Sequence, residues 1–203
     1  MILNDEIKLF GKWSFKGIEV KDPGLVKYIN LTPVFVPKSR GKHAKSQFHK
    51  SKMNIVERLI NKLMVPGHKG KKHVITSDHC TGYWEKKVKI VEKTFEIIEK
   101  KLKKNPIEVL VRAIENAALR EEIASYQVGG IIVRKAVVTS PQRRVDLALR
   151  HIVQAAYKKA FNNKKDMAEA LAEEIIGAYH NDPSKSEAIR EKERIEKEAE
   201  AAR

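Results

Sequence analysis

Residues 105–145 read NPIEVLVRAIENAALREEIASYQVGGIIVRKAVVTSPQRRV, and they contain the signals for three consecutive elements. Asn105-Pro106 supplies an N-cap and a proline at the first helical position, followed by apolar residues at helical spacing. Two segments rich in β-branched residues, 125–128 and 131–139, flank Gly129-Gly130, whose freedom to adopt positive φ suits a two-residue turn. Ser140-Pro141 then repeats the cap-and-proline start. The stretch predicts a helix, a β-hairpin and a second helix that reaches to about residue 161.

Four further helices are predicted on either side of this stretch. Asn54 opens a helical pattern that stops at Val65-Pro66-Gly67, and Val88, Val91, Phe95, Ile98 and Leu102 form one stripe of a long amphipathic helix. On the C-terminal side, we expect a helix from Lys165 to about His180. A capping box at 184–187 opens a final charged helix with only Ile189 and Ile195 to bury. The predicted fold class is mainly α, a bundle of five or six helices with one projecting β-hairpin.

The charge of the chain is large and unevenly distributed. The 203 residues include 41 Lys and Arg against 26 Asp and Glu, a net charge of +15 at pH 7, and residues 37–72 carry +10 of it. Such an excess destabilises an isolated compact protein, so a polyanionic partner is expected. We find no amphipathic or lipidated anchor, no signal sequence and no apolar run of membrane-spanning length, which favours nucleic acid over a membrane. Cys80 is the only cysteine, so a reducing, cytoplasmic location is expected.

The candidate RNA contacts are basic residues near flexible or projecting segments. No acid interrupts residues 37–53, and cations there can displace the counterions condensed on phosphates. Arg134 and Lys135 lie on the hairpin and Arg120 at its base. Arg143 and Arg144 lie in the first turn of a helix, where positive charge opposes the helix dipole, and a nearby phosphate would relieve this conflict. We expect Tyr83-Trp84 to pack against the adjacent helix rather than stack on a base.

The segment 67–80 resembles known phosphate-binding, RNA-binding and zinc-binding motifs, but it lacks the spacing or the structural context that each of them needs. Gly67 to Lys72 has the wrong spacing for a phosphate-binding loop, and the GxxG clamp of a KH domain would need a sheet that is not predicted here. His68, His73, His79 and Cys80 match no usual zinc framework. We therefore predict no metal, no cofactor and no enzymatic activity. Two alternatives stay open: a metal-dependent nucleic-acid enzyme that uses His73, His79 and Cys80, and a DNA-architectural protein with the hairpin in a minor groove.

Several motifs together resemble the small-subunit ribosomal protein S-seven family, in its archaeal and eukaryotic-type branch. The matching segments are Asn105-Pro106, 109–116, 128–130 and 140–145, together with 8–13, 55–59, 70–72 and 95–98. The resemblance implies a structural protein that binds the three-prime major domain of small-subunit rRNA and nucleates assembly of the subunit head. It also implies a hairpin near exit-site tRNA and the mRNA path, and neighbouring ribosomal proteins of the head and platform as partners in translation.

The charge distribution and the resemblance together predict three parts of the chain and the residues that contact RNA. Residues 1–53 are an N-terminal extension, basic from 38; residues 54–183 are a helical RNA-binding body with the hairpin at about 120–139; residues 184–203 are a charged C-terminal helix. The expected rRNA contacts are Lys38, Arg40, Lys42, Lys45, Lys50, Lys52, Lys69, Lys71, Lys72, Arg112, Arg120, Arg143 and Arg144. The hairpin residues expected near tRNA and mRNA are Val128, Gly129, Gly130, Arg134 and Lys135.

The chain departs from the family pattern at two places. Residues from His73 to about Lys86 are expected to be an insertion, because the family passes from its Gly-Lys-Lys almost directly into the next helix. Ala202 stands where the family has an Asn before the final Arg, which weakens any C-terminal contact transferred from the family.

Overall fold

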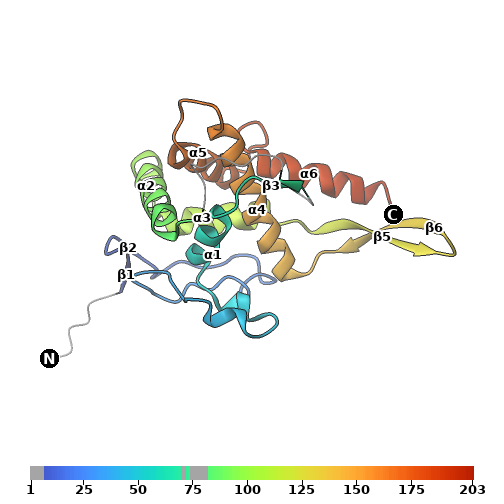
Figure 1. Ribbon diagram of the computed structural model, residues 1–203, viewed down its shortest axis with the longest axis horizontal. Helices are drawn as coiled ribbons and strands as arrows, with labels where there is room; N and C mark the ends of the chain where they lie inside the picture. Colours follow the sequence, from blue (N-terminus) through green and yellow to red (C-terminus); the bar gives the residue numbers. More distant parts are fainter. Residues whose placement is uncertain (1–6, 70–71, 74–81) are drawn as a thin grey trace.

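The computed structural model describes residues 7–69, 72–73 and 82–203, without the side chains of residues 68–69 and 72–73. The described part contains the helices α1 (Ile55–Leu63), α2 (Trp84–Leu102), α3 (Pro106–Ala117), α4 (Pro141–Ala160), α5 (Met167–Tyr179) and α6 (Glu187–Glu200), with the short 3-10 turns η1 (Lys42–Ala44) and η2 (His49–Lys52). Its antiparallel strand pairs are β1 (Lys8–Leu9) with β2 (Trp13–Ser14), β3 (His68–Lys69) with β4 (Lys72–His73), and β5 (Glu121–Val128) with β6 (Ile131–Val138). The helical bundle with a projecting hairpin confirms the predicted fold class (Figure 1).

Local capping explains where two of the helices begin. The side-chain oxygen of Asn54 accepts a hydrogen bond from the Val56 amide at 2.9 Å, and that of Asn105 accepts one from the Ile107 amide at 3.0 Å. These bonds satisfy backbone donors that a helix start leaves unpaired. Ser140 makes no side-chain cap bond, so the start of α4 depends on Pro141 at the first helical position.

The core lies around α3, which packs against α2, α4, α5 and α6. Its residues Ile107, Leu110 and Ile114 are fully buried. The contacts on several sides agree with its sequence, in which apolar residues extend beyond a single helical stripe. None of the described helices combines the length and the apolar character that crossing a membrane requires.

Residues 7–30 are mostly irregular, yet they contribute to the same core. Leu9, Trp13, Phe15, Leu25 and Ile29 are buried together with the helical residues. The Trp13 ring meets the edge of Phe95 of α2 at a centroid distance of 5.5 Å, and its indole nitrogen donates to Glu99 at 3.0 Å. The segment before the basic residues is therefore fixed to the helical body.

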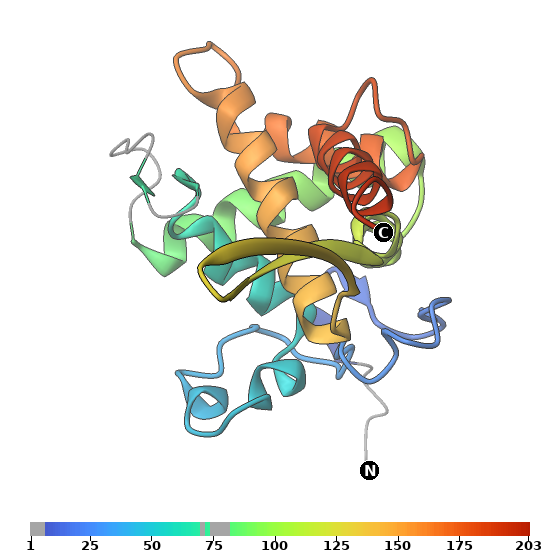
Figure 2. The same ribbon diagram turned by 90° about the vertical axis from the view of Figure 1, so that its right-hand side faces the viewer.

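The hairpin is longer than its β-branched segments suggest. β5 and β6 pair from Glu121 opposite Val138 at the base to Val128 opposite Ile131 at the tip. Gly129 (φ 56°) and Gly130 (φ 89°) form the connecting turn with the positive φ angles that the sequence predicts. The hairpin extends away from the helices in Figure 1 and passes in front of α4 in Figure 2.

The start of α6 differs from the prediction. The N-cap is Ser186, whose hydroxyl accepts from the Ile189 amide at 3.3 Å, whereas Ser184 bonds to Asp182. The expectation that only Ile189 and Ile195 are buried is also wrong, because Ala188 and Ala199 are buried and Ile195 is only partly so. Small alanine side chains let α6 lie close to its neighbours, and Figure 1 shows it running toward the base of β5.

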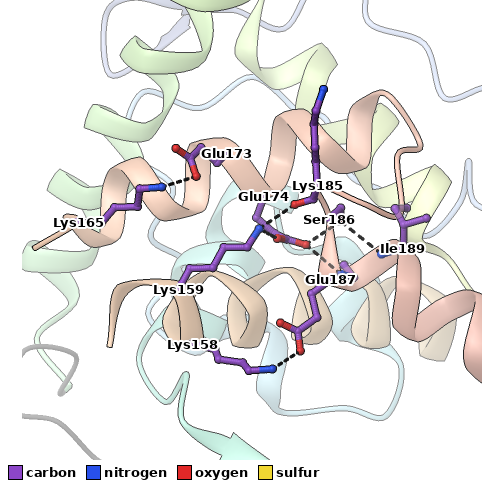
Figure 3. A network of polar contacts seen from close by, with 10 residues as sticks. Lys158, Lys159, Lys165, Glu173, Glu174, Lys185, Ser186, Glu187 and Ile189 are labelled. Carbon is purple, nitrogen blue, oxygen red and sulfur yellow. Dashed lines mark hydrogen bonds and ion pairs between the residues drawn. The ribbon is translucent and has the colours of Figure 1, made fainter. Parts of the chain in front are cut away.

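A buried carboxylate determines which serine caps α6. Glu174 of α5 is fully buried and accepts from Ser186 Oγ at 2.6 Å and from the Ala188 amide at 2.9 Å. Lys159 of α4 donates its ammonium both to Glu174 and, at 2.8 Å, to the Lys185 carbonyl. Figure 3 shows that these contacts join α4, α5 and the start of α6 at one point. We call this cluster of Lys159, Glu174, Ser186 and Ala188 the Glu174 anchor.

Candidate nucleic-acid interface

The basic segment 38–52 presents most of its cations to solvent. Arg40, Lys42, Lys45 and Lys52 are exposed, and none makes an ion pair with another described residue. The 3-10 turns η1 and η2 hold this segment in a compact form without burying any of their residues. The charges of these four side chains are therefore not neutralised by any described carboxylate, and their contact with phosphate stays a prediction.

Lys38 lies beside Trp84, and the predicted packing of the Tyr83-Trp84 pair holds only in part. The Lys38 ammonium lies 4.4 Å from the centroid of the Trp84 ring, a cation–π contact that ties the basic segment to α2. Trp84 is partly buried against the core, but Tyr83 is 68% exposed. The predicted packing thus holds for Trp84 and is wrong for Tyr83, because Tyr83 precedes α2 and faces away from the bundle.

Lys50 is fixed to the helical body by an ion pair. Its ammonium lies 2.8 Å from the Asp146 carboxylate of α4, which also accepts from the buried guanidinium of Arg58 at 3.1 Å. Burial raises the pKa of Asp146, but the Lys50 hydrogen bond and the positive charge of Arg58 outweigh this effect and hold it below its usual value. Asp146 is therefore a carboxylate that two cations already neutralise.

The two arginines at the start of α4 are balanced by the protein's own acids. Arg143 makes a bidentate pair with Glu122 of β5, at 2.6 and 2.7 Å. Arg144 is largely buried; it donates to the Leu119 carbonyl at 2.8 Å and to Asp22 at 2.7 Å. The expected conflict with the helix dipole is thus relieved without a phosphate, so this charge argument for RNA contact does not hold.

A groove of about 1110 Å³ lies beneath the base of the hairpin, and it brings Arg112, Arg120 and Arg144 together. Lys21 and Lys104 also line it, although the sequence did not single them out. The carboxylates that line the groove, Asp22, Glu108 and Glu115, offset part of the charge, and Arg112 pairs with Glu115 at 2.7 Å. Arg120 and Lys21 are exposed, and neither makes a side-chain ion pair with another described residue, which leaves these two as available cations here.

The hairpin tip carries both apolar and basic side chains on its surface. Val128 and Ile131 are exposed, Ile131 by 71%, and Arg134 and Lys135 are exposed farther down β6. Because side chains alternate across a strand, adjacent Arg134 and Lys135 face opposite sides of the hairpin. Each side of the hairpin therefore offers one cation.

Part of the predicted site lies outside the described residues. Lys71, His79 and Cys80 are among these, and of Lys69, Lys72 and His73 only the backbone is described, in β3 and β4. Most of the expected insertion from His73 to about Lys86 also lies there, and α2 already begins at Trp84. Within the described residues, no group of three His, Cys, Asp or Glu side chains could hold a metal ion.

Comparison with known proteins gives a consistent result along the chain. The sequence profile of the family described as "Ribosomal protein S7p/S5e" matches residues 25–203. The chain is 52% identical to "Small ribosomal subunit protein uS7" of Nanoarchaeum equitans over 198 residues, which covers 98% of this chain and 100% of that protein. It is 47% identical to the protein of the same name from Archaeoglobus fulgidus over 199 residues, 98% of this chain and 96% of the relative. The match extends over the helices, the hairpin and the basic segment alike, and the chain therefore belongs to the ribosomal protein S7p/S5e family.

Proposed function

We propose that this chain is a structural, non-catalytic protein of the small ribosomal subunit that binds small-subunit rRNA through its basic surface. Two relatives that match over nearly their whole length bear the name of a small-subunit protein. The observation that carries the RNA assignment is the set of exposed cations on 40–52 that no described carboxylate neutralises. Folded rRNA supplies the phosphates that such a surface requires.

The finer parts of the proposal concern position within the subunit. The protein binds the three-prime major domain of the rRNA, nucleates assembly of the head and contacts neighbouring head and platform proteins in the cytoplasmic ribosome. The hairpin reaches toward exit-site tRNA and the mRNA path. The supporting feature is its shape: the base of the hairpin packs against α6, and the half nearest the tip extends beyond it with mostly exposed side chains.

The test is binding to a transcript of the three-prime major domain as a function of salt. Replacing Arg40, Lys42, Lys45 and Lys52 with Gln should lower the slope of log affinity against log salt by about 3, since each phosphate contact contributes about 0.7 to 0.9. Lys50 stays unchanged in this variant because its ion pair with Asp146 is structural. The matched control replaces four exposed lysines of α2, Lys89, Lys93, Lys100 and Lys101, with Gln.

Two results would contradict the proposal. One is an equal loss of slope in the control, because the effect would then reflect net charge and not the basic segment. The other is binding of a duplex DNA competitor as tightly as the transcript, which would favour an architectural role on DNA.

A further inference from the structure

The seam between α1 and α4 contains a ladder of charges. Arg58 and Lys62 lie one turn apart on α1, and Asp146 and Arg150 lie one turn apart on α4, so each pair shares a helix face. The two helices pack against each other. Asp146 is occupied at one end by Arg58 and Lys50, which leaves Lys62 and Arg150 at the other end without a salt bridge to a described carboxylate.

A pocket of about 380 Å³ opens at that other end. It is lined by Asn61, Lys62, Val65, Pro66, Arg150, Val153 and Gln154. Unlike the groove beneath the hairpin, this pocket has no carboxylate among its described lining residues. It therefore combines two cations, two carboxamides and an apolar wall in a concave site of a size that suits a small anionic group.

The surroundings of Lys62 show a charge that the free protein does not compensate. Burial lowers the pKa of Lys62, and the like charges of Lys50, Arg150 and Arg58 lower it further against the weaker attraction of Asp146. A half-buried ammonium with a depressed pKa destabilises the folded state at neutral pH. An anion bound between Lys62 and Arg150 would remove this penalty.

We propose that the pocket formed by Lys62 and Arg150 holds a backbone phosphate of the rRNA, at a site separate from the groove beneath the hairpin. The inference rests on the proposed function, because it takes the phosphate from the same RNA. Proximity supports this source: Lys50 of the basic segment pairs with Asp146 at the near end of the charge ladder, and its charge acts on Lys62, so the pocket lies close to the segment that carries the exposed cations of 40–52.

The first test compares binding and stability in the same variants. Lys62→Gln and Arg150→Gln together should lower the salt slope by about 1 to 2 and weaken binding to the transcript about five- to thirtyfold at physiological salt. Lys62→Gln alone should raise the melting temperature of the free protein while it lowers RNA affinity. These opposite effects distinguish a ligand site from a purely structural lysine. The matched control, Lys89→Gln with Lys100→Gln on α2, should change neither the slope nor the affinity.

The second test uses the unaltered protein, so it does not depend on how the variants fold. An amine-acylating reagent is applied with and without the transcript, and the modification rate of each lysine is followed by mass spectrometry. RNA should slow the modification of Lys62 at least as strongly as that of Lys45, and leave Lys100 unchanged. An unchanged rate at Lys62, or wild-type affinity in the double variant, would overturn the pocket assignment while the proposed function stands. Absence of binding by the wild-type protein would instead overturn both.

Discussion

The Glu174 anchor should contribute more to stability than any surface ion pair of the chain, and Glu174→Gln tests this. Glutamine keeps the shape of the side chain but removes its charge, and it turns an NH2 group toward donors that now lack an acceptor. The carboxylate receives hydrogen bonds from Lys159, Ser186 and the Ala188 amide, and it is fully buried. Hydrogen bonds to a buried charge contribute about 1.5 to 3 kcal/mol each, and glutamine retains one acceptor, so we expect a loss of about 3 kcal/mol.

The assay is thermal unfolding followed by circular dichroism at pH 7. A loss of about 3 kcal/mol in a chain of this size should lower the melting temperature by about 6 to 12 °C. The neighbouring Glu173 provides a matched control, because it pairs with Lys165 at the surface with 40% of its side chain exposed. Glu173→Gln should cost less than about 1 kcal/mol. Similar losses in both variants would show that the loss of a negative charge from α5 causes the effect, and not the loss of the Glu174 anchor. A Glu174→Gln protein that melts like the wild type would refute the reasoning outright.

Three further predictions follow from single side chains. Arg144→Ala should lower the free energy of unfolding by about 2 to 3 kcal/mol, since Asp22 loses its ion-pair partner and the Leu119 carbonyl loses the donor Arg144. The RNA salt slope should hardly change. Urea unfolding would check this, and a wild-type midpoint would contradict it. The pKa of Asp146 lies below its usual value, so its contribution to stability should be complete above about pH 4 and lost as the pH falls through the folded pKa. Urea midpoints measured between pH 2 and 7 should show that Asp146→Asn removes this part of the acid dependence. Gly130→Val places a β-branched side chain at φ 89° and should disorder the hairpin tip without lowering the melting temperature of the bundle. The amide NMR signals of β5 and β6 would report the disorder. Unchanged signals would argue against a φ requirement at this turn.

Elements specified by neighbouring residues could be predicted from the sequence. Asn54 and Asn105 cap their helices through contacts two residues away, and Gly129-Gly130 determine the turn by their own conformational freedom. The start of α6 could not be predicted in this way, because Ser184 and Ser186 are both acceptable caps locally. The choice is made by Glu174, which lies on another helix and needs a hydroxyl and an amide at one position.

The burial of side chains from residues 7–30 could not be predicted from the sequence, for a similar reason. Leu9 and Trp13 belong to no periodic pattern, so hydrophobic spacing gave no signal for their burial. Trp13 meets partners on α2 that lie more than eighty positions away in the chain. Burial that depends on such distant contacts follows from tertiary packing, which a local pattern does not encode.

For the candidate interface, the sequence predicts where positive charge is concentrated but not how much of it remains available. Arg143 and Arg144 resembled the basic segment in the sequence, yet they are paired with Glu122 and with Asp22, the latter 122 positions away. Lys62 and Arg150 could not be predicted to share a site, because each is an ordinary helical cation in its own segment. Only the packing of α1 on α4 brings them to one pocket.

This distinction between charge and available charge indicates where RNA should bind most strongly. At the hairpin base, carboxylates already hold the guanidinium groups of Arg112, Arg143 and Arg144, so a phosphate would have to compete with partners at 2.6 to 2.7 Å. On the side formed by 40–52 and the α1–α4 seam, Asp146 holds Lys50 and Arg58, but the other cations have no carboxylate partner among the described residues. These are Arg40, Lys42, Lys45, Lys52, Lys62 and Arg150, and the half-buried charge of Lys62 destabilises the folded protein in the absence of an anion. Counterion release favours the second surface, because neutralising an unpaired cation breaks no existing ion pair. We therefore expect the basic segment and the seam to supply most of the salt-dependent affinity, and the hairpin base to act mainly by holding β5 and β6 in a fixed direction.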